Sequence, residues 1–236
     1  MAFNNSTAAV IEKEEPEAKR QKKTTAKIFH VRDFSMLDSA VYGTLTKSAK
    51  CNIVPLSMED TRPILVQLGG GGAIPSAFGV DRKEGEEKAT VTFEIGSDED
   101  HEHLGRLTAE FRDTVCKQWG TWFPDTKVPA SALLADLCNP LVGERKKKRT
   151  GDGVYPGMSK ASLNNKELND GTCVLLNADT KEKMSLEELP GMRWKQIIVE
   201  FKFIYILSSK SYGLTRRLRY LSCEESDDKL EIVPLL

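Results

Sequence analysis

Hydrophobic and polar positions alternate most regularly near the carboxyl end of the chain. From residue 197 to 207 the odd positions are apolar, whereas Glu200 and Lys202 interrupt the even positions. A period of two is typical of a pleated strand, because successive side chains point to opposite faces of a sheet. A polar stretch with a glycine, residues 208–213, separates this run from a second one over residues 214–221. The pattern therefore predicts a long β-hairpin.

The second strand of this hairpin carries three arginines within four residues. Alternation places Arg216 on the apolar side, and Arg217 and Arg219 on the other. Cations crowded in this way repel one another unless an anion neutralises them. The hairpin is thus expected to face a nucleic acid, with a solvated charged face as the alternative.

The centre of the chain has the periodicity of a helix. Spacings of three and four connect Leu104, Leu107, Phe111, Val115 and Trp119. Acidic residues follow Ser97 at positions 98–100, where the helix dipole favours negative charge, so the helix is expected to begin at Ser97. A second, short helix is predicted over residues 129–138. Its buried stripe would consist of Leu133, Leu134 and Leu137.

Shorter elements are expected on both sides of these two features. Strands are predicted at residues 63–68, 89–95 and 172–176, and a turn of helix at 186–189. Four glycines at 69–72 suggest a phosphate-binding loop. No Lys-Ser/Thr pair or helix follows them, so a hinge or bulge is the better interpretation.

These elements predict a β-rich α+β fold, specifically an OB-like β-barrel with helical insertions. Residues 1–26 lack an apolar stripe and are expected to form a disordered N-terminal arm. Residues 27–223 would form the OB-like single-strand-binding domain, and residues 224–236 an acidic C-terminal tail. The cluster Lys19–Lys23 is expected to be either a nuclear import signal or an electrostatic arm.

Charge is distributed unevenly along this chain of 236 residues, whose formal net charge is only -1. Residues 142–166 hold seven Lys and Arg against two acids, and residues 192–221 hold seven against one. A protein that meets phosphates with one surface is expected to show this segregation. The acidic tail could compete for the basic groove and dock replication proteins through its apolar end, or could simply be a solubilising terminus.

Several classes of protein do not fit the sequence. The five cysteines form no CxxC pair, so neither a disulfide framework nor a zinc module is expected, and no cofactor is predicted. No apolar run approaches the length of a membrane span, and the amino terminus lacks an apolar signal core, so we expect an intracellular protein with no membrane partner. Recognisable hydrolase and metalloprotease motifs are lacking, and an enzyme is not expected.

A second basic segment strengthens the expectation of a nucleic-acid site. The run from Arg145 to Arg149 precedes Tyr155, whose ring offers a π face beside the charge; a mobile solvated loop is the alternative. Trp122, at the end of the long helix, is a further candidate for base stacking. The predicted contact residues are Arg145, Lys146, Lys147, Lys148, Arg149, Tyr155, Lys160, Lys202, Tyr212, Arg216, Arg217 and Arg219.

The order of elements resembles that of the single-stranded DNA-binding proteins of large nucleocytoplasmic DNA viruses and of their phage replication counterparts. The resemblance spans roughly residues 60–230. It is carried by WGTWF, KKKR…VYPGMSK, RWKQIIVEFKFIYI, SKSYGLTRRLRYL and the acidic tail. It implies sequence-independent coating of exposed DNA during replication, recombination or repair, without catalysis or an obligatory cofactor, in the nucleus or at a viral replication site. Single-stranded RNA is the alternative ligand. A non-enzymatic virion or chromatin component that binds an acidic protein is the alternative function.

Overall fold

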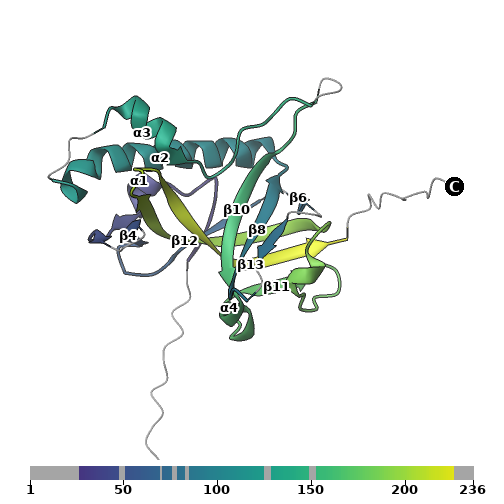
Figure 1. Cartoon of the computed structure of the whole chain (residues 1–236). Coiled ribbons are helices and arrows are strands. Elements are labelled where there is room, and N and C mark those ends of the chain that lie inside the picture. The colour runs from purple at the N-terminus through teal and green to yellow at the C-terminus, as the bar shows by residue number, and fades with distance from the viewer. Residues whose placement is uncertain are drawn as a thin grey trace, which may run out of the picture.

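The computed structural model describes residues 27–47, 51–69, 71–75, 79–82, 85–124, 129–148 and 153–225 (Figure 1). The expectations for the N-terminal arm, and for the tail beyond residue 225, concern residues outside these ranges. Strands account for 43% of the structure and helices for 24%, which confirms the predicted β-rich α+β class. The helices are α1 (Met36–Ser39), α2 (Asp98–Trp122), α3 (Ser131–Leu137), α4 (Asn165–Asn169) and the 3₁₀ turn η1 (Leu186–Glu188).

The described strands form a large sheet with the order β1-β5-β12-β13-β10-β8-β7 along its main path. The strands are β1 (Ile28–His30), β2 (Val41–Tyr42), β3 (Thr46–Lys47), β4 (Cys51–Ser57), β5 (Ile64–Leu68), β6 (Gly72–Ala73), β7 (Val80–Arg82), β8 (Lys88–Ile95), β9 (Cys138–Asn139), β10 (Gly157–Asn164), β11 (Val174–Asn177), β12 (Arg193–Leu207) and β13 (Tyr212–Glu224). Strand β12 also pairs with β4 and β6, and β13 with β9 and β11.

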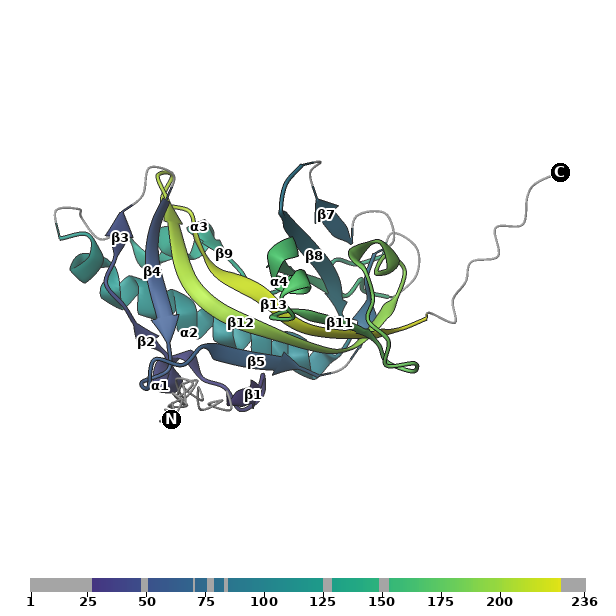
Figure 2. The ribbon, with the colours of Figure 1, turned by 90° about the horizontal axis from the view of Figure 1, so that it is seen from below.

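The sheet is curved but is not closed into a barrel. Within the described residues, the main path ends at β1 and β7, and no ladder joins these two strands. The curvature arises in β12 and β13, whose register shifts at three places. Such bulges bend a strand and increase its twist. The structure therefore corrects the predicted barrel to an open, curved sheet crossed on one face by α2 (Figure 2).

The predicted hairpin is confirmed, with one correction to its pattern. Strands β12 and β13 are antiparallel over almost their whole length, from the pair Arg193–Glu224 to the pair Ile206–Tyr212. A register shift between Phe201 and Phe203 reverses the alternation. The odd positions from Ile197 to Phe201 are buried before this bulge, and the even positions Ile204 and Ile206 are buried after it. The alternation predicts that the odd apolar positions from 197 to 207 share one face, and this prediction is wrong.

The predicted long helix is confirmed from its first residue. The Ser97 hydroxyl accepts a hydrogen bond from the Asp100 amide at 3.3 Å, and this cap begins α2. The whole predicted apolar stripe is buried, and the helix extends three residues further than its last member, to Trp122. For α3 the predicted stripe is only partly right. Leu134 is fully buried, but Leu133 is 49% exposed, because this seven-residue helix packs on the core through one side only.

The glycine run brings backbone segments together. A Cβ atom at Gly71 would lie 2.3 Å from the Trp194 carbonyl oxygen, and one at Gly72 would lie 2.4 Å from the Glu94 carbonyl oxygen. That Glu94 oxygen also accepts a hydrogen bond from the Trp194 indole at 2.7 Å. Because only glycine permits so close an approach, these residues serve packing between β6, β8 and β12 and form no phosphate loop.

Candidate nucleic-acid interface

The two faces of the β12–β13 hairpin lie in different environments. On the face covered by α2, the ring of Phe111 packs against that of Tyr212, with centroids 5.5 Å apart. Phe203 and Tyr205 point to the opposite face and are only partly buried. Figure 2 looks onto this side, with α2 behind β12. This opposite face is termed the open face, and by strand register it contains Ile53, Pro55, Lys160, Phe203, Tyr205 and Arg217.

Tyr205 is held across the backbone of the neighbouring strand. It is paired with Gly213 of β13, and a Cβ atom at Gly213 would lie only 2.4 Å from Tyr205 Oη and 2.9 Å from Cε1. The phenol ring thus occupies the space that a side chain at position 213 would need. Asn139 of β9 donates a hydrogen bond to Tyr205 Oη at 2.9 Å and fixes the far end of the ring. The result is an aromatic surface with a defined position on the open face.

Phe203 extends this aromatic surface by one position along β12. Its partners across the two neighbouring ladders are Pro55 on β4 and Thr215 on β13. Ile53 lies opposite Tyr205 in the same way. Within the described part of the chain, neither Phe203 nor Tyr205 packs against another aromatic ring. Both rings are partly exposed, so part of each is accessible to a planar ligand.

Two predicted lysines lie on strands of this sheet, Lys160 on β10 and Lys202 on β12. Lys160 is exposed on β10, two residues before Ser162, which pairs with Arg217 and therefore shares the open face. Lys202 occupies the bulge between Phe201 and Phe203 and is partly exposed. Neither lysine forms an ion pair with any residue that the structure describes. Their charge is available to an anionic ligand.

Arg217 and Arg219 are ion-paired in the structure. One oxygen of Glu167 on α4, Oε1, lies 3.1 Å from Arg217 Nη1 and 3.0 Å from Arg219 Nη1. Arg219 also donates from Nε to Glu200 Oε2 at 2.7 Å. Two cations and two carboxylates thus form one compact network at the α4 end of the open face. The arginines predicted from sequence are present there, but they have protein partners.

Arg216 lies on the other side of β13, where it is used inside the protein. Its guanidinium donates to the Leu141 carbonyl oxygen and, at 2.8 Å, to the Ser159 hydroxyl. Loss of solvent around this group lowers the pKa of Arg216 to about 10. The predicted phosphate contact at Arg216 does not agree with this placement, because alternation directs the side chain toward the loop packed on α2.

Tyr212 is also on the covered face, although we expected it to be exposed at the hairpin turn. It is the first residue of β13 and is completely buried, and its hydroxyl donates to the Leu134 carbonyl oxygen at 2.9 Å. Burial raises the pKa of Tyr212 well above its ordinary value. Because the strand begins two residues earlier than the sequence indicated, this ring cannot stack on a base without leaving the core.

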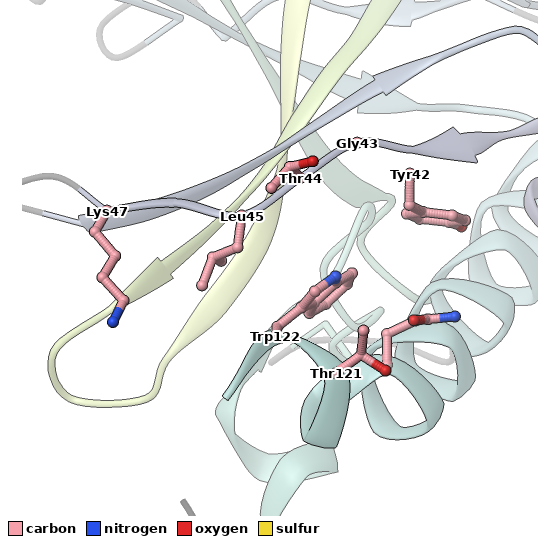
Figure 3. Close-up of a pocket in the computed structure, with 8 residues that line it drawn as sticks. Tyr42, Gly43, Thr44, Leu45, Lys47, Thr121 and Trp122 are labelled. Carbon is pink, nitrogen blue, oxygen red and sulfur yellow. The ribbon is translucent and has the colours of Figure 1, made fainter. Parts of the chain in front are cut away.

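Trp122 packs mainly on protein, with one edge at a surface hollow. The residue is 7% exposed, and its ring centroid lies 6.4 Å from that of Tyr42. The hollow has a volume of about 690 Å³ and lies between the β2–β3 segment and the end of α2 (Figure 3). Lys47 and Gln118 line it together with Trp122. The predicted stacking role for Trp122 therefore concerns a site separate from the open face.

The basic segment forms a short two-stranded arm before β10. The Tyr155 amide donates to the Lys146 carbonyl oxygen at 2.7 Å, and Lys147 forms an antiparallel bridge with Val154. Tyr155 is 52% exposed, and Lys148 Nζ lies 5.8 Å from the centre of its ring. The side chains of Lys146, Lys147 and Lys148 are exposed.

The arm lies apart from the open face. It rises beside the amino-terminal end of α2 in Figure 1, where Arg145 forms an ion pair with Asp98. Arg149 falls outside the described residues. The structure thus brings Lys160, Lys202, Arg217 and Arg219 to one side of the sheet, and keeps Lys146 to Lys148 and Tyr155 together at another place.

Phe203 and Tyr205 were missed as candidate contacts. A simple alternation assigned both to the buried face, and only the bulge reveals their true side. One signal was present in the sequence, because Gly213 interrupts a strand and glycine in a strand often marks a close approach of another group. Counting residue pairs outward from the hairpin turn would have placed Tyr205 opposite Gly213.

Within the ranges that the structure describes, no group of three or more His, Cys, Asp or Glu side chains could hold a metal ion. No helix in those ranges is long and apolar enough to span a bilayer. The five cysteines are free thiols, and burial raises the pKa of Cys173 and of Cys223 to about 12.

Comparisons with known proteins show a structural likeness. No protein-family model matches the chain, and no curated protein matches it. Among solved structures, it is similar to a single-stranded DNA-binding protein from bacteriophage Enc34, with a TM-score of 0.41 and 11% sequence identity. The match covers 83% of this chain and 96% of that chain. Similarity at this level assigns no function, so the functional argument depends on the open face itself.

Proposed function

We propose that this protein binds single-stranded nucleic acid, DNA in the first place, across the open face and without sequence preference. Bases stack on Tyr205 and Phe203, and the backbone phosphates lie near Lys160 and Lys202. Every base has a π face, so stacking combined with a basic surface is tolerant of sequence. The observation that carries the proposal is the partly exposed Tyr205 ring held across Gly213 on the open face.

The proposed binding mode is OB-like, although the described sheet is open. OB-folds bind single strands across a curved sheet with aromatic side chains and cations, and the open face has this combination. A role in replication, recombination or repair, without catalysis, is part of the same proposal. So is a location in the nucleus or at a viral replication site. Contact with replication proteins through the acidic tail, residues 224–236, remains a prediction.

A fluorescence-anisotropy titration with labelled oligo-dT tests this proposal. Tyr205→Ala should weaken binding by about 1–3 kcal/mol, the usual contribution of one base stacked on an aromatic ring. Leu207→Ala is the matched control, because Leu207 is an exposed residue of the same strand without a π face. Equal affinity of the Tyr205→Ala variant and the wild-type protein would rule out stacking at this position.

The basic arm supports a second candidate function. Its exposed lysines lie away from the open face, and Lys148 already stands over the ring of Tyr155. With such a surface, this protein would be a non-enzymatic virion or chromatin component whose basic loop binds an acidic protein partner. In that case the protein would capture the partner while showing no affinity for oligo-dT at low salt. Salt-sensitive binding of oligo-dT would favour the first function.

A further inference from the structure

Glu167 uses both of its carboxylate oxygens, and for different purposes. Oε2 accepts a hydrogen bond from the Asn164 amide at 3.0 Å, which completes the capping box of α4. Oε1 is shared by Arg217 and Arg219, at 3.1 and 3.0 Å. The Glu167 side chain is only 12% exposed, so its position is well defined.

Arg217 is the less satisfied of the two cations. Arg219 has a second partner in Glu200, whereas Arg217 makes one contact with an oxygen that it shares. In addition, Arg217 Nε is buried and has no hydrogen-bond partner. A guanidinium carries five N–H donors and binds an oxyanion best through two of them at once. Arg217 therefore has donors left for a second oxyanion.

The position of Arg217 connects this network with the aromatic surface. Arg217 pairs with Ser162 on β10, and two residues earlier on that strand Lys160 is exposed on the same face. Two residues before Arg217 on β13, Thr215 pairs with Phe203. A strand whose bases cover Phe203 and Tyr205 would thus carry its phosphates past both cations.

We propose that Oε1 of Glu167 occupies the place of a backbone phosphate, and that single-stranded nucleic acid displaces it from Arg217. This inference rests on the proposed function and names one phosphate subsite within it. Glu167 keeps its bond to the Asn164 amide after the exchange, and the amino-terminal end of α4 still favours its charge. Arg219 keeps Glu200. The carboxylate acts as a competitor that lowers the affinity of the open face for nucleic acid.

The cost of this competition is expected to be small. A partly exposed ion pair contributes little, and its loss corresponds to about a twofold to fivefold change in an equilibrium constant. Arg217 contacts the phosphate in the bound wild-type protein as well, so removing the charge of Glu167 adds no neutralised phosphate. The gain in affinity should shrink as salt rises, because salt screens the ion pair that competes with the phosphate, and the slope of log affinity against log salt therefore steepens slightly.

The test compares Glu167→Gln with the wild-type protein in an oligo-dT titration over a series of salt concentrations. Glutamine keeps the cap of α4 and removes the charge. The matched control is Glu188→Gln, because Glu188 closes the capping box of η1 through the Ser185 amide and forms no ion pair with a described residue. Glu167→Gln should bind about two to five times more tightly at low salt and with the steeper slope, whereas the control should match the wild type.

Three further results bear on the inference. Adding Arg217→Gln to Glu167→Gln should abolish the gain, which a merely structural role for Glu167 would not predict. A folded Glu167→Gln protein with wild-type affinity and slope would overturn the inference and leave the proposed function intact. A wild-type protein that does not bind oligo-dT would overturn both.

The wild-type protein provides a second measurement that does not depend on the folding of a variant. The Nε–H resonance of Arg217 should shift when oligo-dT saturates the protein, because its guanidinium exchanges one anion for another. An unchanged Arg217 resonance at saturation would contradict the exchange.

Discussion

The two faces of the β12–β13 hairpin show how neighbouring residues of one strand acquire unrelated tasks. Arg216 and Tyr212 extend into the interior under α2, where each donates hydrogen bonds to backbone carbonyl oxygens. Arg217 directly follows Arg216 in β13, yet it lies on the open face. Tyr205 also lies on the open face, although the next residue, Ile206, pairs with the buried Tyr212. Residue type alone therefore does not identify a nucleic-acid contact. The face on which a residue lies decides whether its substitution affects folding or binding.

The largest effect should come from Tyr212→Ala on the covered face. Removing this buried ring leaves a cavity against Phe111, and the free energy of unfolding should fall by about 3–5 kcal/mol. Denaturant unfolding measures this loss, while the fraction that remains folded should bind oligo-dT normally. Tyr212→Phe is the control and should lose about 1 kcal/mol, for the hydrogen bond to Leu134. Weaker binding by folded Tyr212→Phe would place this ring in the site after all.

A smaller difference is expected between Arg216→Met and Arg217→Met. The first substitution leaves the Leu141 carbonyl oxygen and the Ser159 hydroxyl without this donor, so the unfolding free energy should fall by about 1–3 kcal/mol. The second removes a partly exposed pair and should cost about 1 kcal/mol or less. Salt titrations with oligo-dT should show a flatter slope for Arg217→Met only. A flatter slope for Arg216→Met would contradict the division between the faces.

Gly213→Ala tests the position of Tyr205 without removing it. The new methyl group needs the space of the phenol ring, so Tyr205 must move and binding of oligo-dT should weaken by about 1 kcal/mol. Gly105→Ala is the matched control, because a Cβ atom at Gly105 meets open space on α2. That control should bind normally and gain up to about 1 kcal/mol in stability from better helix propensity. If Gly213→Ala binds as tightly as the control, the fixed position of Tyr205 is not needed.

The smallest effect on stability is expected from the basic arm. Replacing Lys146, Lys147 and Lys148 together by alanine removes exposed charge, so stability should not change. If the arm contacts DNA as a second site, the slope of log affinity against log salt should flatten by up to about 2, or about 0.7 per phosphate. An unchanged slope would confine binding to the open face. Complete loss of binding would make the arm the main site and reverse the order of importance.

Much of this architecture was predictable from sequence because it depends on local patterns. The capping residue Ser97 and the apolar stripe that follows it specified α2 to its first residue. The alternation of Arg216 and Arg217 correctly placed them on opposite sides of a strand. Such patterns work where one face of an element is buried and the period is unbroken.

The remaining features depend on contacts between distant segments. One bulge after Phe201 exchanged the faces of every later residue in β12, and nothing local to Lys202 announces it. The partner of Arg217 and Arg219 is Glu167, about 50 residues earlier in the chain. Strand order and the open state of the sheet likewise follow from long-range pairing, which a single sequence does not contain.

Photo-crosslinking gives the most direct test of binding at the open face. The wild-type protein would be irradiated with an oligo-dT that contains 5-iodouracil, and the adducts would be mapped by mass spectrometry. Stacking on the open face predicts adducts on Tyr205 or Phe203, the rings that lie over β13 and beside Pro55. Adducts confined to Tyr155 on the basic arm, or the absence of adducts on both open-face rings at saturation, would contradict the account.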